Sequence, residues 1–367
     1  MTPAGDVIVV GAGIIGCAIG RELARRGASV RIFEGRTIGG GATHASAGVL
    51  APYIEAHEHP ALFELTIRSL EMYDAFVQEV TRDSGIDIEY RRCGTLQIAT
   101  DAASAETLQE AVLAGPDGGV MRWLSAAEVR SLEPALASTI AGAVLVATHG
   151  YVAAPQLTEA LAWAALRHGA RIDSTDGIVA VRQDGANPLV ETADGQIWPA
   201  RRVIVAAGSW SGQIEGVGLR EGALRPLRGQ LLHLHWPGPP LKHVLWGPEC
   251  YIVPWRDGRL LVGATVEDVG FDERTTAAGV RDLLDAACDL LPDAWRATFI
   301  EARVGLRPAT PDGLPLVGPS PSAPGVIYAT GHFRNGILLA PLTARLVADL
   351  VMDGTVDPLL ARMNPAR

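Results

Sequence analysis

The sequence predicts an α/β fold in which a parallel sheet is joined to a second, mostly antiparallel sheet. Three observations support this. Apolar residues 7–10 run into closely spaced glycines and a helix-like segment. Residues 203–207, after Arg202, form a continuous apolar run, which is typical of a strand buried on both faces of a parallel sheet. Residues 224–266 instead alternate apolar and polar side chains, as antiparallel strands with one solvated face do.

The first segment has the pattern of a dinucleotide-binding βαβ unit. Gly11, Gly13 and Gly16 follow the strand at G-x-G-x-x-G spacing, and Glu34 ends the next strand. Gly11 permits the tight turn, Gly13 lets a pyrophosphate approach the helix N-terminus, and Gly16 allows helix and strand to pack closely. Glu34 is expected to bind ribose hydroxyls, and its charge argues against a 2′-phosphate. This unit alone does not decide between NAD and FAD as the bound cofactor. The alternative, a glycine-rich turn that binds no ligand, is the weaker interpretation.

The following residues predict a binding loop and then a second domain. Residues 39–49 are mostly small, which suits close backbone approach to a flat ligand. Pro60 begins a helix that runs to Ser84 and ends at Gly85. Short strands and a helix near residues 102–113 occupy 86–152. We expect a helix at 155–169 and strands at 169–172, 178–181 and 189–192, with a turn at 194–195.

The C-terminal part predicts a second unit that could face a ligand. A helix at residues 277–291 ends at Pro292, and residues 303–313 are interpreted as a turn-rich segment. A strand at 326–330 leads through the glycine-rich residues 331–336 into an apolar helix at 337–352, capped by Gly354. The N-terminus of that helix is expected to face the ligand.

Composition excludes several functional classes. The chain has 367 residues, of which 48% are hydrophobic, and a formal net charge of -10, which disfavours nucleic acid and anionic membranes as partners. No apolar run reaches the roughly 18 residues of a membrane span. The four cysteines have neither metal-site nor disulfide spacing, so no metal is expected and a reducing cytoplasm fits best.

Several further motifs resemble one family over nearly the whole chain. They are residues 43–48 (THASAG), 250–254 (CYIVP), 258–265 (GRLLVGAT), 305–308 (GLRP) and 331–338 (GHFRNGIL). In this order and spacing they resemble the FAD-dependent D-amino-acid oxidase superfamily, and most closely the bacterial glycine oxidases of thiamine biosynthesis.

The resemblance implies a two-domain fold with bound FAD. A Rossmann-like FAD-binding domain of the glutathione-reductase type would comprise residues 1–85, 153–222 and 300–367, and a mostly antiparallel-sheet substrate domain residues 86–152 and 223–299. FAD is expected to be noncovalent, because members that attach it use a C-terminal cysteine and none follows Cys288. The expected cofactor-binding residues are Gly11, Gly13, Ile14, Ile15, Gly16, Glu34, Ala42, Thr43, Ala47, Gly48, Val49, Ile178, Ala207, Gly208, His332, Phe333, Arg334, Asn335, Gly336, Ile337 and Leu338.

The resemblance also implies a substrate site. Arg307 would bind the substrate carboxylate, while Tyr251 and Arg334 would line the pocket. A guanidinium suits that role because its planar fork holds a carboxylate at two points. The plainer alternatives are a surface salt bridge for Arg307 and a core aromatic for Tyr251. Val49 and Val266 stand where a relative has methionines, which leaves the pocket volume and the substrate open.

The expected reaction needs little from the protein beyond positioning. Hydride transfer from the substrate Cα to flavin N5 gives an imine, which hydrolyses to a 2-oxo acid and ammonia, and oxygen becomes hydrogen peroxide. No side chain is assigned as a catalytic acid or base, and His44 and His332 are treated as loop residues near the flavin without an acid or base role. The expected substrates are glycine, sarcosine and small D-amino acids. Whether the protein forms homo-oligomers or binds a thiazole-synthesis partner stays open. Two rival functions also stay open: a D-amino-acid or N-methyl-amino-acid dehydrogenase that uses an acceptor other than oxygen, and a flavoprotein that serves only in binding or assembly.

Overall fold

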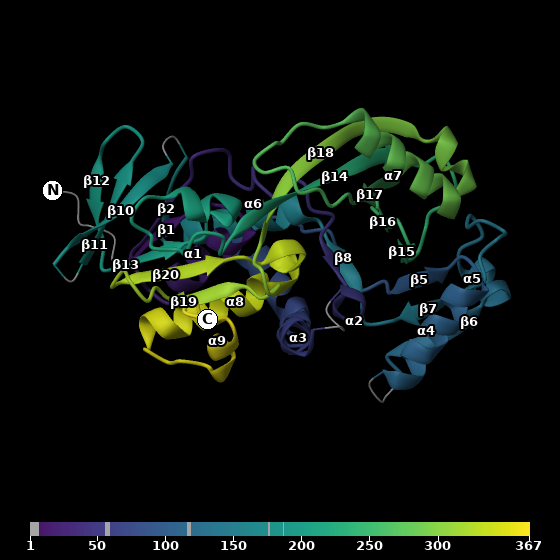
Figure 1. Cartoon of the computed structure of the whole chain (residues 1–367), viewed down its shortest axis with the longest axis horizontal. Coiled ribbons are helices and arrows are strands. Elements are labelled where there is room, and N and C mark those ends of the chain that lie inside the picture. Colours follow the sequence, from purple (N-terminus) through teal and green to yellow (C-terminus); the bar gives the residue numbers. More distant parts are fainter. Residues whose placement is uncertain (1–6, 56–58, 116–118, 175–176, 186) are drawn as a thin grey trace.

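The computed structural model describes residues 7–55, 59–115, 119–174, 177–185 and 187–367. It has two halves that lie side by side (Figure 1). One is built on a parallel sheet and the other on an antiparallel sheet, and they are called here the parallel-sheet half and the antiparallel-sheet half. The α/β fold class predicted from the sequence is thus confirmed.

The parallel-sheet half contains a six-stranded sheet. Its strands in spatial order are β19 (Leu316–Pro319), β20 (Val326–Thr330), β13 (Arg202–Val205), β1 (Val7–Val10), β2 (Val30–Phe33) and β9 (Arg171–Asp173). All neighbours are parallel except β19 and β20. β1 and β13 lie at the centre, which explains why both are continuous apolar runs.

The two faces of this sheet have separate cores. Val7 and Val9 pack with the helices α1 (Ile14–Arg25), α3 (Pro60–Ser84), α6 (Ala154–Arg167) and α8 (Gly336–Met352). Ile8 and Val10 pack instead beneath a three-stranded antiparallel sheet of β10 (Ile178–Asp184), β11 (Asn187–Thr192) and β12 (Ile197–Pro199). This alternation is what the period of two along a strand requires.

Two long helices of this half, α3 and α8, were both predicted from the sequence. Helix α3 begins at Pro60 and ends before Gly85, whose φ of 75° is the left-handed conformation that glycine favours at a helix end. Helix α8, with the residues before it, is long and apolar enough to span a membrane by length and composition, but most of it is buried within the protein. It is therefore a core helix of the parallel-sheet half.

The antiparallel-sheet half contains an eight-stranded sheet. Its strands in spatial order are β18 (Thr298–Ala309), β14 (Arg225–His235), β17 (Arg259–Gly263), β16 (Tyr251–Pro254), β15 (Val244–Trp246), β5 (Thr95–Ala99), β7 (Gly142–Val146) and β6 (Met121–Ser125). Every pair is antiparallel except β15 with β5. Further helices in this half are α4 (Ala102–Ala114), α5 (Ala126–Leu132) and α7 (Ala277–Leu290), followed by η2 (Pro292–Arg296).

Strand β18 corrects one expectation. The prediction of a turn-rich segment at 303–313 is wrong up to Ala309, because this stretch pairs with β14 over nearly its whole length. Only residues 310–313 form the expected turn. The domain limits stay a proposal, and this pairing favours moving the last boundary from residue 300 to the end of β18.

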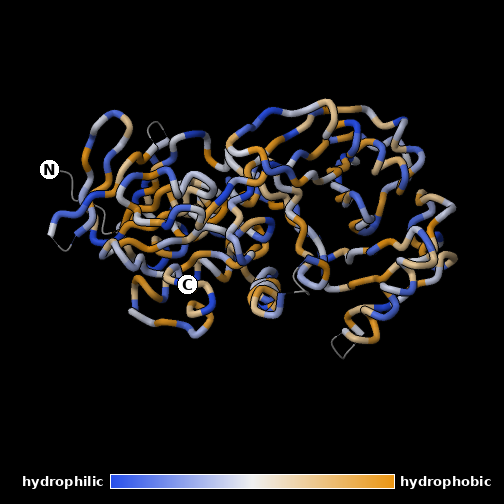
Figure 2. Tube along the Cα trace, viewed as in Figure 1, coloured by the Kyte–Doolittle hydropathy of each residue, from blue (hydrophilic) through white to orange (hydrophobic). Residues whose placement is uncertain are grey.

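Smaller elements connect the two halves. A three-stranded sheet of β3 (Val49–Leu50), β8 (Gly150–Val152) and β4 (Tyr90–Arg91) lies where the chain passes between them, and the short helix α2 (Pro52–Glu55) follows β3. The helices η1 (Gly208–Gln213), η3 (Phe333–Asn335) and α9 (Pro358–Arg362) complete the fold. Figure 2 shows apolar stretches along strands of both halves.

Candidate active site

A cavity of about 550 Å³ lies where the two halves meet. Its wall combines the glycine turn after β1, the loop at 41–49 and the start of α8 with residues from β14, β16 and β18. The volume and the mixed apolar and polar wall are typical of a pocket for a cofactor and a small substrate.

The glycine turn has the geometry that its spacing predicted. Gly11 has a φ of 102°, and a Cβ there would lie 2.7 Å from the Ala206 carbonyl oxygen. A Cβ on Gly16 would lie 1.9 Å from the Gly11 oxygen, so α1 packs against the turn at a distance that only glycine allows. A Cβ on Gly13 would meet only the Thr43 hydroxyl, at 3.5 Å, and the space beside the helix N-terminus is therefore open.

Glu34 lies at the end of β2 and lines the cavity. One carboxylate oxygen accepts a hydrogen bond from the Ala12 N–H at 2.6 Å, and the other accepts one from the Arg36 N–H at 2.9 Å. These contacts fix the carboxylate beside the glycine turn. Each oxygen keeps a second lone pair with which it could accept a ribose hydroxyl.

The structure brings most of the predicted cofactor residues to this one cavity. Those on its wall are Gly11, Gly13, Ile14, Ile15, Glu34, Ala42, Thr43, Ala47, Gly48, Val49, Ile178, Ala207, Gly208, His332, Phe333, Arg334, Gly336 and Ile337. Within the described part of the chain, Gly16, Asn335 and Leu338 lie behind this wall. Gly16 acts through packing, and Leu338 is buried in the core beside α3.

The start of α8 is the second helix N-terminus at the cavity. Asn335 precedes the helix, and its side chain makes no capping hydrogen bond to the described residues. Its buried Oδ1 likewise has no partner there. His332 is buried, its Nε2 lies 3.1 Å from the Thr343 hydroxyl, and burial lowers its pKa to about 3. His332 is therefore neutral at physiological pH and adds no charge to the positive end of the helix dipole.

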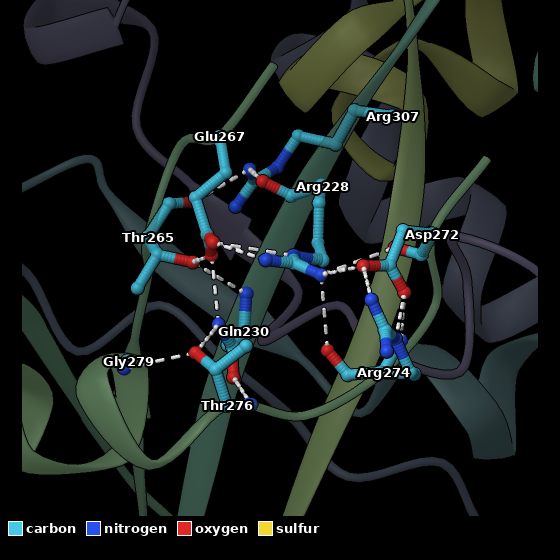
Figure 3. A network of polar contacts seen from close by, with 9 residues as sticks. All are labelled: Arg228, Gln230, Thr265, Glu267, Asp272, Arg274, Thr276, Gly279 and Arg307. Carbon is cyan, nitrogen blue, oxygen red and sulfur yellow. Dashed lines mark hydrogen bonds and ion pairs between the residues drawn. The ribbon is translucent and has the colours of Figure 1, made fainter. Parts of the chain in front are cut away.

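The Arg307 side chain projects from β18 and lines the end of the cavity where the substrate is expected. Figure 3 shows it beside Thr265 and Arg228. Its Nη1 donates to the Thr265 carbonyl at 2.8 Å and, more weakly, to the Arg228 carbonyl at 3.5 Å. A Cβ on Gly229 would lie 2.3 Å from the guanidinium, so the glycine clears the space that the arginine occupies. These contacts leave Arg307 with free N–H donors for a carboxylate.

Four ionisable groups share this end of the cavity: Arg307, Tyr251, Arg334 and Glu55. Burial lowers the pKa of Arg307, an effect that Tyr251 and Glu55 oppose. Burial raises the pKa of Tyr251 to about 12. Burial also raises the pKa of Glu55 to about 7, although the positive charges of Arg334 and Arg307 pull it down. The site therefore carries excess positive charge and would stabilise an anion.

Glu55 and Trp246 are among the residues of this wall that the sequence did not predict. Glu55 lies on α2, a helix too short to leave a periodic pattern, and the sequence around it gave no signal. Trp246 lies on β15, with its ring centroid 5.2 Å from that of Tyr251 across the β15–β16 pair. Val49 and Val266 both line the cavity, as expected of residues that set its volume.

The residues present fit FAD. A dinucleotide is an elongated ligand and needs a long cavity. One continuous cavity is lined by Glu34, the N-termini of α1 and α8, and Arg307, and glycine backbone without side chains forms part of its wall. The described residues contain no group of three or more His, Cys, Asp or Glu that could hold a metal ion. All four cysteines are free thiols.

Comparison with known proteins agrees with this geometry. The family model of FAD dependent oxidoreductases (DAO) matches residues 6–350. Glycine oxidase from Geobacillus kaustophilus is 38% identical over 96% of this chain and 94% of its own length, and its crystal structure superposes with a TM-score of 0.92 over 99% of this chain and 98% of that one.

Two further proteins are similar over nearly the whole chain. The bifunctional protein ThiO/ThiG of Nostoc sp. is 35% identical over 99% of this chain, which spans 55% of that longer protein. Iminodiacetate oxidase from Chelativorans sp. BNC1 is 32% identical, with a TM-score of 0.90 over 98% of each chain.

Proposed function

The chain belongs to the family of FAD dependent oxidoreductases, and we propose that it is a glycine oxidase. In the presence of oxygen and water it converts glycine to glyoxylate, ammonia and hydrogen peroxide, and it also accepts sarcosine and small D-amino acids. The observation that carries this proposal is the fixed Arg307 guanidinium, which lies with Tyr251 and Arg334 in the same cavity as the dinucleotide-binding turn.

Arg307 and Arg334 set the orientation of the substrate. A carboxylate that enters this end of the cavity meets two guanidinium groups, and the N–H groups of Arg307 that are not used by the Thr265 carbonyl form the planar contact. The Tyr251 hydroxyl remains protonated, because its pKa is about 12, and it can donate a hydrogen bond to the same carboxylate. Bound FAD supplies the acceptor of the two electrons that leave the Cα–H bond.

Glu55 is suited to act on the substrate amine. Amino acids arrive with a protonated amine, which must lose its proton before the Cα–H bond is oxidised. The carboxyl of Glu55 shares the cavity with both arginines, and its pKa of about 7 is close to the operating pH, as a proton acceptor needs. We assign to Glu55 the proton that leaves the ammonium group.

The test is a substrate panel with the purified holoprotein. Glycine, sarcosine, D-alanine and iminodiacetate are compared by peroxide release in air and by loss of flavin absorbance without oxygen. Iminodiacetate belongs in the panel because a 32% identical neighbour is an oxidase of that compound. Peroxide formed with glycine supports the proposal. Flavin reduction without peroxide would indicate a dehydrogenase, and no reduction by any amine would indicate a binding or assembly role.

The wider setting follows from the fused relatives. In the ThiO/ThiG proteins the region that matches this chain is covalently joined to a further segment, so we propose the thiazole branch of thiamine biosynthesis as the destination of the product and a ThiG-like protein as a partner. A cytoplasmic location and self-association fit such a role. Pull-down of a thiazole synthase from the same genome by this protein would support the partnership.

A further inference from the structure

Residues 264–276 leave the antiparallel sheet after β17 and reach the parallel-sheet half before α7 begins. This segment is called here the strap. It carries Val266 on the cavity wall and Thr265, whose carbonyl holds Arg307. The isolated bridge between Arg228 and Glu267 joins the strap to β14 through two backbone hydrogen bonds, at 2.8 Å and 3.0 Å, and the Thr265 N–H donates to the Gln230 carbonyl at 3.2 Å. Beyond Glu267, the hydrogen bonds between described residues of the strap and β14 all involve side chains.

A buried ion pair fixes the strap to β14 (Figure 3). The Arg228 side chain is 5% exposed and donates to the Glu267 carboxylate at 2.5 Å and 3.2 Å. The same guanidinium lies 2.9 Å from the Asp272 carboxylate and donates to the Arg274 carbonyl at 3.2 Å. One arginine therefore holds three points of the strap.

A second side chain of β14 holds the strap on the other side of Glu267. The Gln230 amide donates to Glu267 at 2.8 Å and to Thr276 at 3.0 Å, and its oxygen accepts the Thr276 N–H at 2.9 Å. The Thr265 hydroxyl donates to Glu267 at 2.7 Å and accepts the Gln230 N–H at 2.9 Å. Glu267 is thus the centre of the network, and its carboxylate is hydrogen-bonded directly to the Thr265 hydroxyl.

The far end of the strap contacts the parallel-sheet half. Glu273 forms a two-point contact with Arg36, at 2.7 Å and 2.9 Å, two residues beyond Glu34. Phe271 packs on Trp210, with ring centroids 5.9 Å apart, and the Arg36 guanidinium lies 4.1 Å above the Trp210 ring. Arg36 and Trp210 both line the cavity. The strap therefore links the wall of the dinucleotide site to the carboxylate site.

We propose that the strap is a positioning device for the substrate, in which the Arg228–Glu267 pair fixes the Thr265 carbonyl and this carbonyl in turn fixes the Arg307 guanidinium. The inference rests on the proposed role of Arg307 in carboxylate binding. Glu267 and Arg228 act through other residues and are positioning residues. Loss of their charge pairing should loosen Thr265 and spread Arg307 over several orientations, which weakens carboxylate binding and leaves the oxidation of bound substrate intact.

The experiment compares Glu267→Gln with Asp268→Asn in the holoprotein. Both remove one carboxylate from adjacent positions, but Asp268 pairs with Arg225 at the surface, where the two side chains are 63% and 58% exposed. Two quantities are measured: kcat and KM for glycine, and the Kd of glycolate, a carboxylate without an amine, from its effect on the flavin absorption spectrum. Arg228→Lys and Arg228→Ala are measured beside them.

The expected result is a rise of about tenfold in both KM and the glycolate Kd for Glu267→Gln, with kcat changed by less than about twofold, as neighbours in one network allow. Asp268→Asn should match the wild type, and Arg228→Lys should retain more affinity than Arg228→Ala.

A lower Tm for Glu267→Gln with unchanged KM and Kd would overturn the proposal, because the pair would then serve stability alone. If wild-type protein binds glycolate tightly but does not oxidise glycine, the proposed function fails and the strap is still tested by the Kd values. If wild-type protein binds no carboxylate, both proposals fail.

Discussion

Replacing Arg307 by alanine should remove the contact that orients the substrate. In the enclosed cavity, loss of one partner of a charge-assisted pair costs about 2 to 5 kcal/mol, which corresponds to a loss of roughly 30-fold to several thousand-fold in kcat/KM for glycine. The upper part of the range is expected if two of the free N–H groups of Arg307 meet the carboxylate together. Arg307→Lys should recover only part of the loss, because an ammonium cannot form the planar two-point contact.

The same replacement should change stability much less than activity. The Thr265 carbonyl loses its 2.8 Å donor, and a buried acceptor left without a partner costs about 1 to 3 kcal/mol. Burial, however, already lowers the pKa of Arg307, so the substrate-free protein is relieved of a poorly solvated charge. These two effects oppose each other, and we expect a shift of only a few degrees in Tm.

The assay is steady-state kinetics on glycine, with thermal unfolding and the flavin spectrum recorded on the same preparations. Arg225→Ala is the matched control, because Arg225 lies on the paired strand and its largely exposed side chain forms a surface ion pair with Asp268. It should behave as the wild type. An Arg307→Ala variant that keeps a wild-type kcat/KM would refute the assignment of Arg307 to the carboxylate.

Three further predictions concern the cofactor and Glu55. Glu34→Ala should weaken FAD binding by about 10-fold to 100-fold, from the loss of charged hydrogen bonds, measured as apoprotein after dialysis; unchanged occupancy would show that the acid does not reach the ribose. Acid precipitation should release the flavin to the supernatant, and colour retained in the pellet would show a covalent link. Folding raises the pKa of Glu55 to about 7, so the folded protein holds this proton more tightly than the unfolded chain and the stability it contributes is lost as the pH rises through 7. The Tm of substrate-free Glu55→Gln relative to wild type should therefore be higher at pH 8 than at pH 5, and a difference that does not change with pH would contradict this environment for Glu55.

Local constraints made the dinucleotide part of the site predictable. A Cβ on Gly16 would collide with the Gly11 carbonyl oxygen, and Gly11 has the positive φ that the tight turn after β1 requires, so both glycines are dictated within one short stretch of chain. The close approach of Gly11 to Ala206 is an additional, distant constraint. Helix α3 was predictable for the same reason, since Pro60 and Gly85 act on their own backbone. Arg307, Tyr251 and Arg334 were identified through the family resemblance, and the structure brings them to one cavity.

Features that depend on distant partners were not predictable in this way. Gly305 and Pro308 gave β18 the appearance of a turn, and only its pairing with β14 makes it a strand. Glu267 looks like an ordinary surface acid in the sequence, because its partner Arg228 lies far away along the chain and is buried. Glu55 acquires its raised pKa from burial in a cavity that both halves of the chain create.

Anaerobic mixing of the purified protein with glycine, followed by admission of air, tests the central claim most directly. Glycine should abolish the yellow flavin absorbance in the absence of oxygen. Air should then restore the colour with formation of one hydrogen peroxide for each glyoxylate. Absorbance that persists with glycine, sarcosine and D-alanine alike would contradict the claim that this chain is an amino-acid oxidase.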